Sequence, residues 1–519
     1  MPAKKKENNS PFIVPINQEK ADLKIEFLPA EEILDIVSTV KRIKVFLEEK
    51  NFRILEAFLT GGETGTALMD RYINLVSSMI YSPKNIMFDI VPEGGFNFKD
   101  YEQSIVMNLK NKIESDFVEE GIDEFLFECA KWGELFGCIG AKLQVTKKGI
   151  KPKLLYPWEI LFYYPELSVD DPSQIIVIVN KMGKREAKKR FGVELAEEAE
   201  IPRGAFEGGR LFERIQEAYV EIKGPEDIEK VSPSEIYTKY LVGFLRGFKD
   251  LVEIYEVWYK EQNHDKVCVA IVVGNKVVDH RVNPILQNDF PFAFYIGDPI
   301  VNSLYGRGSG DRALKIQEKL DEWVKFLDFA AELLCQPPLL IRTLQGIYDI
   351  EKVKQELITP GGAYVFESAD MQVEPYTPQI PLDVVFNIIN YYEKCLIESM
   401  GMNEMLVGTA MKNVRSASHA QILAMLGGSF IESKALKFEQ FLERLMTLWA
   451  YLLKAIDEEG KYNLLTPFRV EVYAHTSSPI SALAYMDLIF SLMEAGVIPP
   501  DILIEILPIP MKWKIKNLL

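Results

Sequence analysis

The stretch Tyr305-Gly306-Arg307-Gly308-Ser309-Gly310-Asp311-Arg312 marks the point where the character of the chain changes. From 311 to 334, apolar residues recur at gaps of three and four, the spacing of one face of an amphipathic helix. At 1.5 Å per residue such a helix is roughly 36 Å long. It must end at Gln336-Pro337-Pro338, because proline lacks the amide donor and clashes with the preceding turn.

A second long helix is predicted after a small insert. The insert, residues 336–380, contains two short runs typical of strands, 339–343 and 363–367, with a short helix predicted between them. The second helix begins with Pro381, which suits a first helical turn, and continues with an apolar stripe at helical spacing. Two long helices joined through a compact insert predict an antiparallel pair with the insert as its tip.

The rest of the chain alternates between helical and strand patterns, which predicts an α+β fold class. Before Gly306, apolar spacing predicts helices at 31–60, 66–78, 101–138 and near 184–190, and strands at 86–91, 139–145, 175–179, 252–259 and 267–273. After a loop at 405–415, a very long helix is predicted at 416–457, with a weakening or kink at Gly427-Gly428, followed by a strand near 468–473 and short helices at 481–495 and after 499.

Composition limits the classes of protein that the chain can be. Its 519 residues suggest several domains, and the five cysteines are scattered without a C-x-x-C pair, as in a reduced intracellular protein. The net charge of −17 argues against a general nucleic-acid binder, but not against a protein that lets DNA pass.

Lys4-Lys5-Lys6 is followed by polar residues, so residues 1–30 are interpreted as a flexible arm and not a secretory signal. No run approaches the ~18 apolar residues that cross a bilayer, so no membrane partner is expected.

The glycines Gly306, Gly308 and Gly310 resemble a phosphate-binding loop, but the resemblance is incomplete. No Lys-Ser/Thr pair follows them, and the third glycine is misplaced for G-x-G-x-x-G. We interpret the three glycines as a hinge before the helix. The alternative, a nucleotide-dependent enzyme using residues 306–310, predicts saturable ATP binding that is lost in Gly308→Val.

No other residues form a convincing catalytic or metal-binding set. The four histidines are His264, His280, His419 and His475, and none pairs with another at metal-ligand spacing. Asp279-His280 is predicted to be a surface turn and not an acid–base pair. We therefore expect a protein that is not an enzyme and has no cofactor and no metal.

Four segments together resemble portal proteins of tailed double-stranded DNA bacteriophages. They are Asn283-Pro284, Phe290-Pro291-Phe292, the glycine-rich stretch 305–312, and Gln336-Pro337-Pro338-Leu339-Leu340. The resemblance is specific over about 284–420 and elsewhere rests on the order of elements. It implies the portal fold, in these parts: a flexible N-terminal arm 1–30, an α/β wing 31–310, stem helix 311–335, an α/β clip 336–380, stem helix 381–404, a tunnel loop 405–416, a long spine helix and strand 417–475, and a short helical crown 476–519.

The resemblance also implies partners and a location. Portal subunits form a ring, usually a dodecamer, at one capsid vertex of the virion, after assembly in the host cytoplasm. Double-stranded DNA is packaged and ejected through the ring, and the packaging terminase, tail adaptors and capsid proteins dock on it. By this resemblance, Lys412, Asn413 and Arg415 would meet DNA in the tunnel loop, and Trp323 and Leu327 would pack the stem. Another phage head or tail connector component is the remaining alternative.

Charge supports a DNA channel independently. From 311 to 404, 16 Asp and Glu oppose 8 Lys and Arg, a net charge of −8. An acidic lining repels the phosphate backbone over roughly 8–10 Å at physiological salt. These acids are also what a solvated helix face would carry, so their place on a channel wall is a hypothesis.

Overall fold

The computed structural model of the chain describes residues 25–60, 68–81, 88–94, 96–146, 149–199, 251–261, 263, 266–283, 286, 288–343, 363–367, 372–375, 380–402, 417–457, 460–472 and 491. Several predictions fall outside these residues. They are the N-terminal arm up to residue 24, the short helix at 350–357, the tunnel loop with Lys412, Asn413 and Arg415, and the crown 476–519 apart from residue 491.

Four helices open the fold close to where apolar spacing predicts them. They are α1 (Ala30–Thr60), α2 (Leu68–Ile80), α3 (Asp100–Glu119) and α4 (Ile122–Phe136). The predicted helical region 101–138 is thus two helices. The break falls at Gly121, whose φ of 64° is a left-handed conformation that favours glycine. Gly137, with φ of 85°, ends α4 in the same conformation and turns the chain into a strand.

The largest sheet has five strands in the order β4-β5-β6-β7-β8, and every neighbouring pair is antiparallel. In an antiparallel sheet, a short turn can join two successive strands, as it does between β7 and β8. Helices α5 (Lys184–Phe191) and α6 (Val193–Glu198) pack against it. The strands are β4 (Ile160–Phe162), β5 (Ile176–Gly183), β6 (Leu251–Lys260), β7 (Val267–Val273) and β8 (Lys276–Val282).

Three smaller sheets complete the body. The first has the order β3-β2-β9, and the other two are the antiparallel pairs β1-β15 and β10-β11. In the second of these sheets, Phe88 pairs with Val472, so segments from both ends of the described chain meet. The strands are β1 (Phe88–Pro92), β2 (Cys138–Thr146), β3 (Gly149–Leu155), β9 (Phe292–Ile296), β10 (Asp298–Ile300), β11 (Ser303–Arg307) and β15 (Phe468–Val472).

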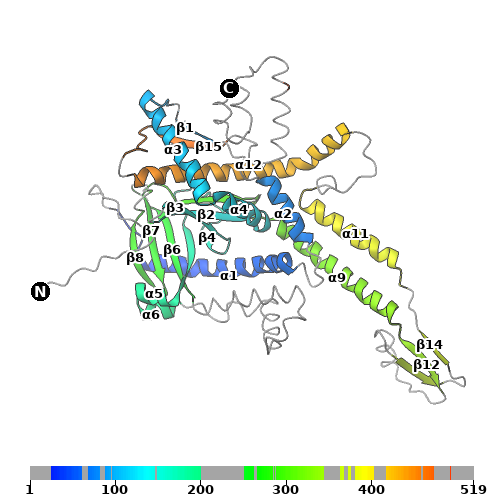
Figure 1. The fold of residues 1–519 in the computed structure, drawn as a ribbon. Coiled ribbons are helices and arrows are strands. Elements are labelled where there is room, and N and C mark those ends of the chain that lie inside the picture. The colour runs from blue at the N-terminus through cyan, green and yellow to red at the C-terminus, as the bar shows by residue number, and fades with distance from the viewer. Residues whose placement is uncertain are drawn as a thin grey trace.

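Helix α12 (Ala417–Ile456) lies across the body on the side of β2 and β3 away from α1 (Figure 1). It is one continuous helix through Gly427 and Gly428, and a kink there stays a prediction. Its buried face carries Phe438, Leu445 and Trp449, which join the main core with residues of α1, α2, α4 and β2. Trp449 Nε1 donates a hydrogen bond of 3.1 Å to Asp116 Oδ2 on α3. The core therefore fixes α12 to the N-terminal helices.

Two helices leave this body together (Figure 1). They are α9 (Ser309–Cys335) and α11 (Leu382–Ser399), and they lie side by side and lead to a small sheet. Its strands are β12 (Leu339–Thr343), β13 (Ala363–Glu367) and β14 (Gln372–Pro375). The predicted helix pair with a compact insert between its two members is confirmed.

The predicted surface turn at Asp279-His280 is wrong. Both residues lie in β8, where His280 pairs with Ala270 of β7. His280 Nε2 lies 2.5 Å from the hydroxyl of Tyr259, and its ring lies 4.4 Å from that of Phe27. Burial lowers the pKa of His280. His280 therefore packs against Tyr259 and Phe27. The dipeptide Asp279-His280 alone does not predict this packing.

Candidate functional site

The projecting pair of helices is held together by few buried side chains. On α9 the buried residues include Leu320, Ala330 and Leu333, and on α11 they include Val385 and Leu396. Each helix turns one narrow stripe toward its partner, which is all that a two-helix pair can cover. Helix α9 also contacts α1, α2 and α4, and Leu396 of α11 belongs to the main core, so solvent meets the two helices mainly where they extend away from the body.

Trp323 and Leu327, the residues expected to pack the stem, lie on α9 and are both half-buried. The Trp323 ring makes an edge contact with Phe326, with 5.9 Å between the ring centroids. Part of each side chain therefore stays available for a further contact. That this contact is with a neighbouring subunit stays a prediction.

Large apolar side chains remain exposed along the same two helices. On α9 these are Phe326 and Phe329, and on α11 they are Val384, Phe386 and Tyr391, with exposed fractions from 38% for Phe329 to 63% for Tyr391. We call these five residues the stem apolar set. Scattered single apolar residues on a surface are normal, whereas surfaces for association gather several such residues together.

The tip sheet has the order β13-β12-β14. Strand β12 follows directly from α9 and lies in the centre, parallel to β13 and antiparallel to β14. Leu339 pairs with Pro375, so the chain enters and leaves the sheet at adjacent positions. Among the described strands of this sheet, β13 and β14 lie at its edges, and an edge strand offers backbone groups to a partner.

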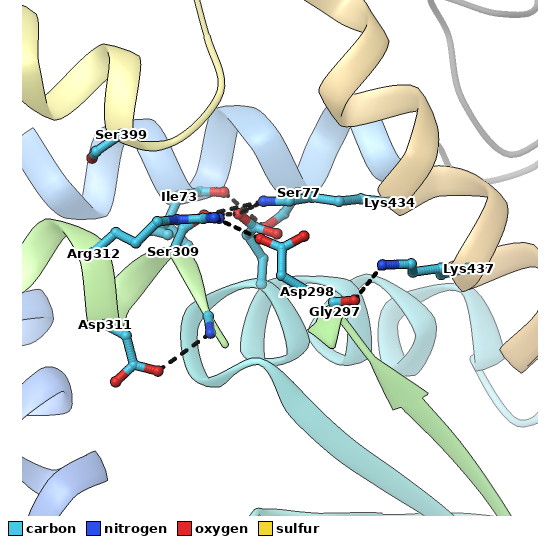
Figure 2. Close-up of polar contacts among 12 residues, drawn as sticks. Ile73, Ser77, Gly297, Asp298, Ser309, Asp311, Arg312, Ser399, Lys434 and Lys437 are labelled. Carbon is cyan, nitrogen blue, oxygen red and sulfur yellow. Dashed lines mark hydrogen bonds and ion pairs between the residues drawn. The ribbon is translucent and has the colours of Figure 1, made fainter. Parts of the chain in front are cut away.

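A buried ion pair stands where the projecting helices join the body (Figure 2). Lys434 of α12 donates to Glu134 Oε1 of α4 at 2.5 Å, and both side chains are 2% exposed. Ser309, the first residue of α9, donates to the same carboxylate and accepts a 3.1 Å hydrogen bond from Lys434. A buried charge is stable only when it is paired and hydrogen-bonded, so this triad needs all three members.

A second group of contacts surrounds the triad. Arg312 of α9 lies 2.6 Å from Asp298 of β10, and Lys437 of α12 donates to the carbonyl of Gly297 at 2.6 Å. The Phe430 ring lies beneath two cations, 5.2 Å from the Arg312 guanidinium and 4.7 Å from Lys434 Nζ. These contacts tie the first turn of α9 to α12 from both sides. We call the triad and these contacts the stem junction.

Gly306 and Gly308, which precede α9, and Gly310, its second residue, pack closely against the end of α4. A Cβ on Gly308 would overlap the carbonyl oxygen of Leu135, and a Cβ on Gly306 would overlap that of Gly137. Gly310 likewise faces Ile54 and Leu135. Close approach of two backbones thus explains why glycine is needed at each position. Motion at this joint, predicted from the sequence, stays a prediction.

The same packing bears on the glycine-loop interpretation. The amide of Gly308 donates to Asp311 Oδ2 at 3.3 Å, and Gly306 lies within strand β11. A phosphate cradle requires backbone amides that point into an open space. Here the space beside the glycines is occupied by α4 and its C-terminal turn. The described geometry of 306–310 is that of a packed strand-to-helix connection.

Within the described part of the chain, no group of three or more His, Cys, Asp or Glu is placed to hold a metal ion. None of the helices in these residues combines the length and the apolar character that crossing a membrane requires. No sequence pattern reveals the Glu134–Lys434 pair, because its members are isolated charges in different helices.

Comparisons with known proteins give one finding. No family model matches the chain, and no curated protein matches it. Among solved structures, it is similar to a chain of the "Virion of native gene transfer agent (GTA) particle", with 9% identity and a TM-score of 0.42, covering 86% of this chain and 89% of that chain. A likeness this loose identifies neither fold nor function, and neither is assigned from it. The structure of the chain is that of a mixed α/β protein.

Proposed function

We propose that the chain is the subunit of a ring-shaped portal that occupies one vertex of a phage capsid. The observation that carries the proposal is the projecting pair α9 and α11, which ends in a separate sheet and exposes the stem apolar set. In a single subunit, the apolar side chains of this helix pair stay in contact with water. Copies arranged around an axis would bury these sides against one another and place every tip at one end.

The proposal extends to DNA. A ring of stems would form a channel whose wall carries the net charge of −8 found between 311 and 404. Such a wall conducts the phosphate backbone without binding it tightly. Lys412, Asn413 and Arg415, in the predicted tunnel loop 405–416, are the proposed groups that touch DNA in passing. The stem junction supports this design, because it holds the stem to the helix that follows the loop.

The tip sheet is the proposed docking site for the terminase and the tail adaptors. Its two edge strands, β13 and β14, suit pairing with a strand of a partner. Residues 336–380 would then lie at the narrow end of the ring, outside the capsid. Capsid proteins would contact the wider body, and the ring would be part of the virion. The chain would have no catalytic role in this assembly.

Electron microscopy tests the proposal directly. Purified full-length chain should give closed rings in class averages viewed down the axis, and native mass spectrometry should give one subunit number, twelve in the usual case. A central channel with the tip sheets at its narrow end separates a portal from another connector. Particles that remain monomers under all assembly conditions would contradict the proposal.

A calorimetric titration with ATP distinguishes the proposed portal from the nucleotide-dependent enzyme. Saturable ATP binding by the unaltered chain would support that enzyme. Gly308→Val is a poor test, because the valine side chain would overlap Leu135 and disturb the fold itself. The decisive measurement is therefore made on the unaltered chain, where we expect no saturable binding.

A further inference from the structure

A pocket opens on the five-stranded sheet, and its lining residues belong to neither α9 nor α11. It has a volume of about 220 Å³ and lies between β3, β5, β6 and the end of α5. Pockets for drug-sized ligands are roughly 300–1,000 Å³, so this one suits a smaller molecule. Its lining residues are Gln144, Lys153, Asn180, Lys181, Met182, Arg190, Phe191, Ile254, Glu256 and Ile271.

Three of the lining side chains are cations. Lys153, Lys181 and Arg190 come from β3, β5 and α5, and all three are half-buried, so solvent reaches them. Burial lowers the pKa of each. A buried cation is more stable when an anion approaches, because the attraction between opposite charges grows as water is excluded.

The one carboxylate in the lining is already engaged. Glu256 accepts hydrogen bonds from Lys142, from Asn180 Nδ2 at 2.7 Å and from Trp258 Nε1 at 3.0 Å. Burial alone would raise the pKa of Glu256, but the attraction of Lys142 and these bonds hold it below its ordinary value. Lys153 in turn donates to the neutral Asn180 Oδ1 at 2.9 Å.

The charged groups around the pocket are both acidic and basic. Glu48 and Glu253 pair with Lys44 beside Lys181. The other charged groups that act on the three cations are Lys142, Glu159, Glu186, Asp279 and Arg281. None of these groups is part of the lining itself, where three cations face one carboxylate.

Apart from the amides of Gln144 and Asn180, the rest of the wall is apolar. Met182, Phe191, Ile254 and Ile271 complete the lining. A ligand that fits this surface therefore needs a compact apolar part as well as an anionic group. Inorganic phosphate would satisfy only the cations, and a neutral aromatic molecule would satisfy only the apolar wall.

We propose that this pocket binds a small phosphate monoester, with its phosphate against Lys153, Lys181 and Arg190 and its apolar group against Phe191 and Ile254. Arginine presents a planar fork that matches two phosphate oxygens, and lysine adds a compact charge. The chain has a net charge of −17, so its surface as a whole repels such an anion. The pocket would be a local exception that selects small phosphate esters, independent of any role in a ring.

Calorimetric titration of the full-length chain with phenyl phosphate tests the proposal. We expect saturable binding of one molecule per chain, with phenol and inorganic phosphate each at least about tenfold weaker, because each lacks one half of the contacts. Absence of saturable binding would overturn the proposal. So would equal binding of inorganic phosphate, which would mean an adventitious ion only.

Variants assign the binding to the pocket. Lys181→Gln and Arg190→Gln should each weaken phenyl phosphate binding by about tenfold or more, as expected for one lost charge-assisted hydrogen bond. Lys189→Gln is the matched control, because Lys189 is exposed on the same helix and does not line the pocket. Thermal denaturation shows whether each variant is folded. A folded Arg190→Gln that binds as well as the unaltered chain would contradict the assignment.

Discussion

Lys434 Nζ lies 2.5 Å from Glu134 Oε1, across 300 positions of sequence and inside the body of the protein. The pair joins α12 to α4 and shares Ser309 with the first turn of α9. One polar contact thus connects α12, which follows the proposed tunnel loop, with α4 and α9. Its importance can be measured by removing one charge and then both.

Replacing one member of this pair should be costly. Lys434→Met leaves the Glu134 carboxylate buried without its cation, which typically destabilises a fold by about 3–5 kcal/mol. Glu134→Gln together with Lys434→Met should recover most of that loss. Chemical denaturation measures all three proteins. Arg53→Gln is the control, because Arg53 and Glu318 form an exposed pair that should contribute about 0–1 kcal/mol. A single variant as stable as this control would contradict the structural role.

Gly308→Ala tests the close packing of the glycines before α9. The added methyl group would overlap the Leu135 carbonyl, so the free energy of unfolding should fall by about 3 kcal/mol, the upper end for overpacking. Gly183→Ala is the matched control, because a Cβ there meets nothing within 4 Å. Similar unfolding curves for both variants would show that the joint has space, as a loose hinge would.

The stem apolar set should be needed for assembly but not for folding. Phe329→Glu on α9 and Phe386→Glu on α11 would each place a charge at every contact between neighbouring stems. We expect native mass to shift from rings to monomers, with a melting temperature of the monomer close to that of the unaltered chain. Phe96→Glu, at an exposed phenylalanine outside the stem, should still form rings. Rings of normal mass in both stem variants would exclude this surface from the interface.

Acid should weaken the contact between α3 and the segment before β15. Glu102 accepts a 3.0 Å hydrogen bond from the Lys99 amide and further bonds from Thr466, and these hold its pKa below 4.5. A carboxyl with a lowered pKa stabilises the fold above its unfolded pKa and loses this effect as pH falls through the folded value.

Glu102→Gln should therefore melt at a lower temperature than the unaltered chain at neutral pH. The difference should shrink as the pH falls below about 4.3, the pKa of an ordinary glutamate, and through the lower folded pKa of Glu102, because its carboxyl then becomes neutral. Thermal denaturation across this range measures it. Glu114→Gln, at an exposed position of the same helix, should show no such convergence. A constant difference at every pH would mean that the charge of Glu102 has no part in it.

Much of the fold could be predicted where local sequence decides the outcome. The prolines after Gln336 end α9 at Cys335, and the apolar run before Thr60 forms α1 as expected. Each case depends on residues within a few turns of one another. The small strands β10 and β11 were not predicted, since a glycine-rich stretch gives a weak strand signal.

The site could be predicted only in part, because its contacts are distant in the sequence. The projecting pair follows from two helical patterns and an insert. The stem junction does not, because Glu134, Ser309 and Lys434 are ordinary residues until the core brings α4, α9 and α12 together. The tight packing of Gly308 was also hidden, since flexibility and close approach both favour glycine.

The pairing of Leu339 with Pro375 has a consequence for how such a protein can change over generations. The chain passes into the tip sheet and out of it through two neighbouring crossings, so the body is joined to that sheet at only one place. Insertions, deletions or wholesale replacement of the residues between the crossings leave the helices below them in register. Lineages could therefore exchange this end as a cassette when they acquire a new partner, while the rest of the molecule keeps its sequence.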